Sequence, residues 1–280
     1  MHGAIFNHRG RVRLWSPALL PLLVAGVLAW HGGRVWVRHG LETANYSPAP
    51  EGMVLVPAGP CLIGSNDKDS ESDERPLRTV WVGAFYIDKT TVTNKELAKA
   101  VPKHTYAAGQ DDLPAVNVLR SEAVAYAQAV GKRLPTAAEW EKAARGTDGR
   151  RYPWGNDWKA ENANVARRDS ASTAQVAATG PVCAIRPGHV MQGGSFPAGA
   201  SPFGVLDMAG NVWEWVADIH QQRTWWGKPL GPARGILKGG AFGYGPRQCR
   251  ASYNGFEDLD ATCHDTGFRC AQDAAPTGGS

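Results

Sequence analysis

Hydrophobic and polar positions along this chain change over short distances, and the pattern predicts short elements separated by turns. From Met53 the run M-V-L-V-P-A-G-P-C-L-I-G-S predicts two strands around a Pro-Ala-Gly turn. The β-branched and aromatic residues between Arg78 and Thr93 predict two further strands. The last block, from Ile236 to Ala271, has strand-like residues at both ends of a glycine-rich region. The body of the chain is therefore expected to contain several short strands.

Helical spacing occurs in three stretches between these strand signals. Two of them begin with a capping box, in which a threonine and a glutamate three residues later satisfy neighbouring backbone N–H groups. The boxes are Thr93–Glu96, whose helix should stop before Pro102, and Thr136–Glu139, whose helix should end at Gly146. The third stretch runs from 121 to 131, and its narrow apolar face consists of Ala123, Val124, Ala127 and Val130.

Three other stretches show no regular period. Between Asn162 and Phe203 the chain is dominated by Gly, Ala, Ser and Pro, and so long a loop is uncommon unless something such as a bound ion orders it. The acidic run from Asn66 to Pro76 predicts a solvated loop. After Ala271 the residues are polar, so the C-terminal tail is expected to fray.

An apolar segment near the N-terminus has the character of a membrane anchor. No charged residue occurs between Leu14 and Trp30, and a bilayer span takes about 20 residues, with a lower limit of about 17. Three arginines at positions 9, 11 and 13 precede it, which by the positive-inside rule leaves the N-terminus in the cytoplasm. We expect an uncleaved single-pass anchor in a bacterial inner membrane, because no A-x-A cleavage site follows. The alternative is an exported domain released from a signal peptide.

Length and composition fit one large domain behind this anchor. The chain has 280 residues, and its 33 Gly and 11 Trp indicate a loop-rich fold whose core depends on aromatic burial. The net charge of +4 is mild and no basic stripe is present, so no nucleic-acid partner is expected. The expected parts are a cytoplasmic N-terminus (1–13), an anchor or signal segment (14–37), a linker (38–52), the domain (53–272) and a flexible tail (273–280).

The five cysteines give little information by themselves. They form no C-x-x-C pair, so a zinc ribbon or a thioredoxin-like motif is not indicated. An odd number leaves at least one free thiol if the others pair. Cys263 and Cys270 are close enough in sequence to bridge, although separation does not show that they do. The full set is Cys61, Cys183, Cys249, Cys263 and Cys270.

The stretch from Phe203 to Trp215, F-G-V-L-D-M-A-G-N-V-W-E-W, combines apolar residues, carboxylates and two indoles. Two glycines interrupt it, so it cannot form one regular helix. Asp207 and Glu214, set among exposed carbonyls in an irregular loop, suit a hard cation such as Ca²⁺. The alternative is a core loop in which these two carboxylates only cap turns. The residues alone leave both interpretations open.

Seven motifs, in a fixed order, are similar to those of the formylglycine-generating enzyme family, also called the sulfatase-modifying-factor domain. They are M-V-L-V-P-A-G…I-G-S, F-Y-I-D-K-T-T-V-T-N, G-K-R-L-P-T-A-A-E-W-E-K-A-A-R-G, Y-P-W-G-N, F-G-V-L-D-M-A-G-N-V-W-E-W, K-G-G-A-F and T-G-F-R-C-A. They cover the chain from Met53 to Ala271. The resemblance implies an α+β domain of C-type-lectin-like fold, with little regular secondary structure and held by calcium.

The resemblance also implies two calcium sites. At the first, side-chain and backbone oxygens would come from Asp207, Gly210, Val212 and Glu214, and this donor set agrees with the preference of Ca²⁺ for carboxylates and carbonyls. A second site would begin at Asn164 and Val165, but its remaining ligands cannot be placed in the loop that follows.

The family's catalytic positions are only partly present. Active members oxidise a client cysteine to formylglycine with O₂ and a Cu(I) ion held by two thiolates, which are soft ligands suited to copper. Their pattern after a glycine pair is Ser, two residues, Cys, four residues, Cys. Here those positions hold Ala241, Tyr244 and Cys249. A phenol is a poor Cu(I) ligand, so the missing thiolate argues against the copper mechanism.

The sequence leaves more than one interpretation open for Cys249 and for Cys270. Cys249 is the one remaining candidate for a catalytic residue, and it could equally be a buried small hydrophobe or a disulfide partner. The family cysteine that usually pairs with the position of Cys270 is Ala127 here. Cys270 must therefore be free or pair elsewhere.

Three functions follow from these observations. The leading hypothesis is a periplasmic accessory or maturation protein that binds, and in one version modifies, a secreted protein or peptide client. The first alternative is an active cysteine oxidase that makes formylglycine on a sulfatase-type client, using copper, Cys249 and a second thiol such as Cys263. The other is a non-catalytic calcium-held module, in which Trp225 and Trp226 form a stacking platform for a glycan, although paired Trp residues often pack in a core.

Overall fold

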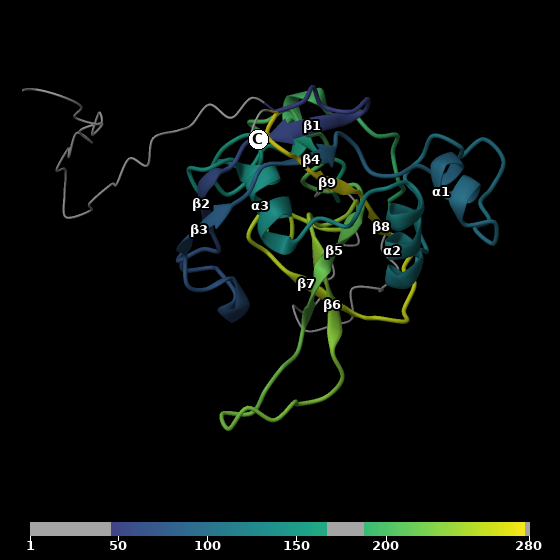
Figure 1. Cartoon of the computed structure of the whole chain (residues 1–280). Helices are drawn as coiled ribbons and strands as arrows, with labels where there is room; N and C mark the ends of the chain where they lie inside the picture. The colour runs from purple at the N-terminus through teal and green to yellow at the C-terminus, as the bar shows by residue number, and fades with distance from the viewer. Residues whose placement is uncertain (1–45, 167–187, 278–280) are drawn as a thin grey trace, which may run out of the picture. The chain divides into compact units, whose positions relative to one another are not determined.

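The computed structural model describes residues 46–166 and 188–277 (Figure 1). In these residues nine strands fall into three small sheets, with the orders β1-β4-β9, β2-β3 and β7-β6-β5-β8. The strands are β1 (Met53–Val56), β2 (Gly59–Ile63), β3 (Arg78–Val82), β4 (Phe85–Asp88), β5 (Trp213–His220), β6 (Arg234–Lys238), β7 (Gly255–Asp258), β8 (Thr266–Phe268) and β9 (Ala271–Asp273).

The two strands around the Pro-Ala-Gly turn exist, but they do not pair with each other. β1 runs antiparallel to β4, whereas β2 runs antiparallel to β3. The turn therefore passes the chain from one sheet to the next. The four-stranded sheet mixes directions, because β5 is antiparallel to β6 and parallel to β8. A mixed sheet of this kind, together with separate helices, agrees with the predicted α+β class.

Both capping boxes are confirmed. Thr93 caps α1 (Asn94–Ala100) and Thr136 caps α3 (Ala137–Arg145), each exchanging hydrogen bonds with the glutamate three residues later. α3 ends at Gly146, whose φ of 71° lies in the left-handed region that glycine adopts without strain.

The helix α2 (Arg120–Ala129) also forms, but part of its predicted apolar face is wrong. Ala123 and Ala127 are buried, whereas Val130 is the C-cap and is exposed. Tyr126, which the prediction omitted, packs edge-on against Phe268 at 5.5 Å and joins α2 to β8. A bulky aromatic residue between two alanines fills the space that the small side chains leave.

The core depends on aromatic burial, as the composition predicts. Trp140, Trp213 and Trp215 are fully buried in the two larger apolar clusters. Trp215 donates its indole N–H to the carbonyl of Val118 at 3.0 Å, which satisfies the one polar group of that side chain.

The acidic run between 66 and 76 is not simply a solvated loop, so that prediction is wrong in part. Glu74, in the 3₁₀ helix Ser72–Glu74, is buried and accepts hydrogen bonds from Arg250 and Ser252, both at 2.6 Å. Burial alone would raise the pKa of Glu74, but these two donors outweigh it and hold the pKa below its ordinary value. The run therefore ties the start of the domain to the segment after Cys249.

The C-terminal region is ordered further than expected. β9 reaches Asp273 and pairs with β4, and Arg133 forms an ion pair with Asp273 at 2.5 Å. The predicted anchor falls on residues 1–45, which lie outside the described residues, as do Cys183 and residues 167–187 of the long irregular loop. Within residues 46–166 and 188–277, no helix is both long and apolar enough to cross a bilayer.

β5 and β6 continue into a hairpin that projects from the rest of the domain (Figure 1). Its loop, residues 221–233, is called the hairpin tip below. The sequence pattern did not indicate this hairpin, because the two strands share few alternating positions and their register shifts between Trp215 and Ile219.

Candidate functional site

The stretch from 203 to 215 forms an irregular loop that enters the four-stranded sheet at Trp213. Asp207 and Asn211 have φ angles of 57° and 69°, so two non-glycine residues are held in the left-handed region. At Gly210 a Cβ atom would lie 2.4 Å from the carbonyl oxygen of Asn164, so only glycine fits. The backbone N–H of Asn211 donates to the same Asn164 carbonyl at 2.8 Å.

The Asn211 side chain joins three segments of the chain. Its Oδ1 accepts from the Asn164 side-chain amide and from the backbone N–H of Met191, each at 2.9 Å, and its Nδ2 donates to the Met191 carbonyl. Val165 packs with Ala209 in a small apolar cluster. The two segments predicted to hold separate calcium ions therefore lie against each other. The sequence reasoning missed Asn211, although an asparagine after a glycine in a loop is a signal for left-handed backbone.

Glu214 is paired with an arginine rather than left free. Arg269 approaches its carboxylate with two donors, Nε to Oε2 and Nη2 to Oε1, both at 2.7 Å, and Trp140 Nε1 adds a third hydrogen bond at 2.7 Å. Both charged side chains are buried. Burial would lower the pKa of Arg269, but the facing carboxylates, Glu214 first, raise it. Glu214 consequently supports the fold, and only Oε1 has a lone pair left for a cation.

The buried carboxylate of Asp207 has fewer hydrogen-bond partners than that of Glu214. Its Oδ2 accepts one hydrogen bond, from the backbone N–H of Gly194 at 2.7 Å. Burial raises the pKa of Asp207 and the nearby Glu214 raises it further, against the opposing effects of Gly194 and Arg269.

The oxygen donors around Asp207 suit one calcium ion, although few of them are side-chain carboxylates. Two carboxylates and one guanidinium leave a formal charge of −1 on Asp207, Glu214 and Arg269 together, so a cation is electrostatically favoured beside Asp207. Backbone carbonyls of the same loop, at Gly210 and Val212, are the kind of oxygen that Ca²⁺ accepts. Within the described ranges, no cluster of three or more His, Cys, Asp or Glu side chains could hold a metal ion. A metal here would depend on Asp207 and on backbone oxygens.

Cys249 lies in an apolar environment. It is fully buried with Ala163, Val165 and Ala209, and its Sγ lies 2.8 Å from the point where a Cβ on Gly240 would stand. Burial raises the pKa of the Cys249 thiol to about 12, although a backbone hydrogen bond from Gly210 opposes the shift. Because the thiolate is the form that attacks and binds metal, burial keeps Cys249 in its less reactive thiol form at neutral pH.

The position of the missing second cysteine is part of the core. Tyr244 is buried and meets Trp213 edge-on, with ring centroids 5.2 Å apart. Ala241, also buried, accepts a hydrogen bond from the Tyr244 backbone N–H at 2.9 Å. Tyr244 and Ala241 belong to one apolar cluster and Cys249 to another. Side-chain packing therefore fills the positions where the family chemistry would take place.

Among the described residues, Cys263 and Cys270 do not supply a second thiol at this site. Cys263 is disulfide-bonded, so the hypothesis that it serves as a free thiol beside Cys249 is wrong. Cys270 is a free, buried thiol, which excludes a Cys263–Cys270 bridge and agrees with the expectation that Cys270 is free or pairs elsewhere. Burial, and next the carboxylate of Asp88, raise the pKa of Cys270.

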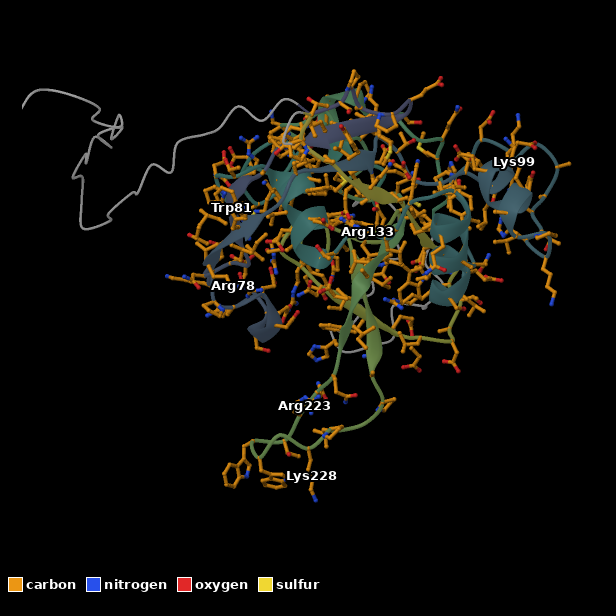
Figure 2. All side chains as sticks on the ribbon, viewed as in Figure 1. Arg78, Trp81, Lys99, Arg133, Arg223 and Lys228 are labelled. Atoms are coloured by element: carbon orange, nitrogen blue, oxygen red, sulfur yellow. The ribbon has the colours of Figure 1, made fainter. Side chains whose placement is uncertain are left out.

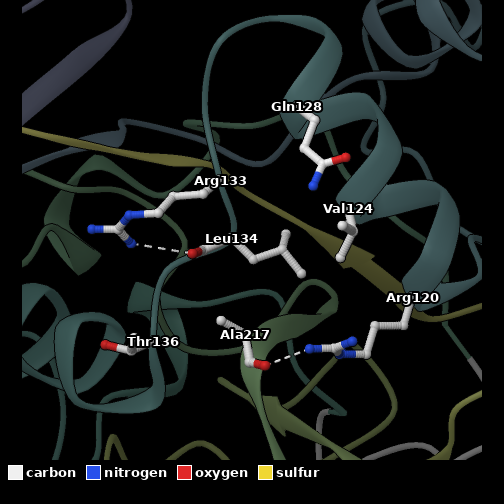
Figure 3. A pocket seen from close by; sticks show the side chains of 7 residues that line it. All are labelled: Arg120, Val124, Gln128, Arg133, Leu134, Thr136 and Ala217. Carbon is white, nitrogen blue, oxygen red and sulfur yellow. Dashed lines mark hydrogen bonds between the residues drawn. The ribbon is translucent and has the colours of Figure 1, made fainter.

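A groove of about 370 Å³ lies between α2 and the start of α3 (Figure 3). Leu134 and Val124 point toward one another across it, and Ala217 of β5 lies below them. Arg120 donates to the Ala217 carbonyl, and Arg133 donates to the Leu134 carbonyl at 3.2 Å. The lining is Arg120, Val124, Gln128, Arg133, Leu134, Thr136 and Ala217, none of which the sequence had marked as functional. The groove combines an apolar floor with a polar rim.

Several known proteins resemble this chain over most of its length. The formylglycine-generating enzyme of Streptomyces coelicolor is 36% identical, over 82% of this chain and 91% of the relative. The inactive Cα-formylglycine-generating enzyme 2 of Mus musculus is 26% identical, over 94% of this chain and 97% of the relative. Among solved structures, PvdO from Pseudomonas aeruginosa aligns with a TM-score of 0.62 and 26% identity, over 79% of this chain and 94% of that chain.

The family model described as a sulfatase-modifying factor enzyme 1-like domain matches residues 40–274. This range includes every strand and helix described above. The chain therefore belongs to the formylglycine-generating enzyme family of sulfatase-modifying-factor domains.

Proposed function

We propose that this protein is an accessory or maturation protein of the formylglycine-generating enzyme type, which binds a secreted protein or peptide without the two-thiolate copper chemistry. The observation that carries the proposal is the state of Cys249. It is the one sulfur at the family's two thiolate positions, and it is buried with a pKa raised to about 12. Family membership alone does not decide the activity, because relatives named as enzymes and as inactive enzymes both match.

The alternative of an active oxidase needs a second sulfur that can reach Cys249 as a thiolate. Cys263 is disulfide-bonded, and Tyr244 occupies the second family position with its ring packed on Trp213. A copper ion at this place would have one soft ligand and an apolar surrounding, which does not fit Cu(I). No reaction step is therefore assigned to copper.

The groove between α2 and α3 is the proposed contact for the client. Its floor of Val124, Leu134 and Ala217 suits an apolar side chain, and the side-chain amide of Gln128 on its rim suits a backbone carbonyl of an extended peptide. The rim guanidinium of Arg133 already donates to Glu139, Asp273 and Leu134, so it shapes the groove. The volume of about 370 Å³ is within the usual range for a small binding pocket.

The proposed location is the periplasmic face of a bacterial inner membrane. The apolar segment within 14–37, preceded by three arginines, serves as the single-pass anchor with its N-terminus in the cytoplasm. The disulfide at Cys263 is consistent with an oxidising compartment. Protease added to spheroplasts is expected to digest the domain, whereas a protected domain would contradict this location.

The proposed metal is calcium, held through Asp207 and the carbonyls of Gly210 and Val212, with Glu214 contributing one oxygen at most. Asn164 and Val165 are kept as a second, weaker calcium segment. The close contact between the two segments supports a shared role, because an ion at one would restrain the backbone of the other. Calcium here would stabilise the loop and would not take part in a reaction.

A matched pair of variants tests the function. Val124→Glu places a charge on the groove floor, whereas Ser121→Glu places the same charge on an exposed position of the same helix. We expect cross-linking to the co-expressed client to fall at least tenfold for Val124→Glu and to stay unchanged for Ser121→Glu and Cys249→Ala, with the client cysteines intact by mass spectrometry. Conversion of a client cysteine to formylglycine that depends on Cys249 would contradict the proposal.

A further inference from the structure

The hairpin tip exposes large apolar side chains far from the groove and from Cys249. Trp225 is 91% exposed and Trp226 is 59% exposed, and Leu230 and Ile219 are exposed on the same hairpin. Figure 2 shows Arg223 and Lys228 on this projecting loop, well separated from the labelled residues of the domain body. Two adjacent exposed indoles are not explained by core packing, so the alternative that this pair packs in the core is wrong here.

Part of the backbone of the tip is hydrogen-bonded within the tip. Thr224 and Lys228 are joined by a backbone hydrogen bond of 2.8 Å, and the Leu230 N–H donates to the Gln222 carbonyl at 2.8 Å. The Arg223 guanidinium donates to the Gly227 carbonyl at 2.8 Å. These bonds reduce the cost of moving the tip into a poorly hydrated region, because the groups that they join do not lose a water partner there.

The charge around the tip has one sign. Within the tip, residues 221–233, the sequence contains no Asp or Glu, whereas Arg223 and Lys228 are basic. Indoles are enriched where an apolar interior meets polar headgroups, and basic residues beside them are attracted to anionic lipids. The tip therefore combines the two features that a peripheral membrane contact needs.

The arrangement of the two indole rings disfavours a glycan-binding platform at the hairpin tip. The two indole rings are T-shaped, with centroids 5.2 Å apart and an interplanar angle of 78°, so they do not form one flat surface. The nearby polar side chains are already used, since Gln221 donates to the Gly231 carbonyl and the Thr224 hydroxyl bonds with Lys228. A sugar would find few free hydrogen-bonding groups beside the rings.

We propose that the hairpin tip is a membrane-contact site, in which Trp225, Trp226 and Leu230 enter the headgroup region of an anionic phospholipid bilayer and Lys228 contacts lipid phosphates. This contact is separate from the client groove. It would fix the orientation of the domain on the membrane surface.

The test uses the full chain with vesicles of brominated phosphatidylcholine that contain about 30% phosphatidylglycerol. The emission of the tip is obtained by subtracting the spectrum of the Trp225→Phe, Trp226→Phe double variant from that of the wild type. We expect this tip emission to shift to shorter wavelength and to be quenched on anionic vesicles. Because the signal is local to two indoles, it does not depend on how other segments associate with the vesicle.

Trp81 supplies the matched control, since it is 63% exposed but lies on β3 of the domain body (Figure 2). The emission isolated with Trp81→Phe is expected to stay unquenched. Lys228→Gln is expected to raise the anionic lipid needed for half-maximal quenching about fivefold. Tip emission unchanged by anionic vesicles would overturn the proposal. Tip emission that responds to soluble glycans or to the client instead of to vesicles would overturn it as well.

Discussion

Two regions of this domain, one that keeps a family motif and one that departs from the family pattern, have opposite physical character. The loop from 207 to 214 is a dense polar network, in which Glu214, Arg269 and Asn211 are buried and hydrogen-bonded. The block from 241 to 249 is apolar, with Tyr244 and Cys249 packed into separate clusters. The difference teaches that the groups holding the fold and the groups that would perform chemistry are separable. A chain can keep the scaffold while packing replaces the reactive positions.

The largest expected loss of stability comes from the polar network around Glu214. Arg269→Met would leave the Glu214 carboxylate buried without its counter-ion, and breaking such a pair costs about 3–5 kcal/mol. Chemical denaturation should show this loss of unfolding free energy. Arg234→Met is the control, because its pair with Asp258 is long (3.6 Å) and exposed, and it should cost less than about 1 kcal/mol. Equal costs for the two variants would show that the buried pair does not support the fold.

Calcium binding is expected to give the next largest change in stability. If the ion binds beside Asp207, calcium at about 100 times its Kd stabilises the domain by about 2.7 kcal/mol. We expect chelator to lower the Tm of the wild type and to leave that of Asp207→Asn unchanged, since asparagine can still accept from Gly194 but brings no charge. The Glu214 position is a poor one for this test, because its substitution also breaks the ion pair with Arg269. A wild-type melting curve that does not respond to chelator would remove the calcium assignment.

On the apolar side the expected effect is smaller. Cys249→Ala removes a buried sulfur from a small cluster and should cost about 1–2 kcal/mol of unfolding free energy. Because the pKa of Cys249 is raised to about 12, thiol-specific reagents should modify it only on unfolding between pH 7 and 9. Rapid modification of the native protein at pH 7 that is lost in Cys249→Ala would show an activated thiolate instead.

The pH dependence of Asp207 is the smallest effect and has a defined sign. Its pKa in the folded state is raised above the ordinary value of 3.8, so the folded state prefers the protonated form. In chelator, the wild type should therefore lose stability relative to Asp207→Asn as the pH rises from about 3.8 through the higher folded-state pKa. Calcium at neutral pH should reverse this loss. A stability difference that is independent of pH would show that Asp207 is not a strained carboxylate.

The sequence predicted those parts of the fold that depend on neighbours along the chain. The capping boxes at Thr93 and Thr136 and the stop at Gly146 are local chemistry, and all three formed as expected. It did not predict Glu74 in the core or the pairing of Glu214 with Arg269, because those partners are 176 and 55 positions apart. Nothing in a local pattern records which distant charge will meet a carboxylate.

The candidate site shows the same limit. Motif spacing identified Tyr244 and Cys249 as the positions that matter, but not that one would pack on Trp213 and the other would lie beside Ala209. The paired indoles in the hairpin tip were noticed as a motif, yet their exposure depends on a β5–β6 hairpin that the residue pattern did not indicate. Whether a side chain is accessible is decided by packing, which residue types and spacing do not fix.

The most direct test of the central claim is an anaerobic Cu(I) titration in competition with a chromophoric chelator, comparing wild type with Cys249→Ser. A single buried thiol offers Cu(I) only one soft ligand, so the account predicts that the two proteins leave the chelator equally loaded at every copper concentration. One equivalent of copper withdrawn from the chelator by the wild type, and not by Cys249→Ser, would contradict the account and restore the oxidase.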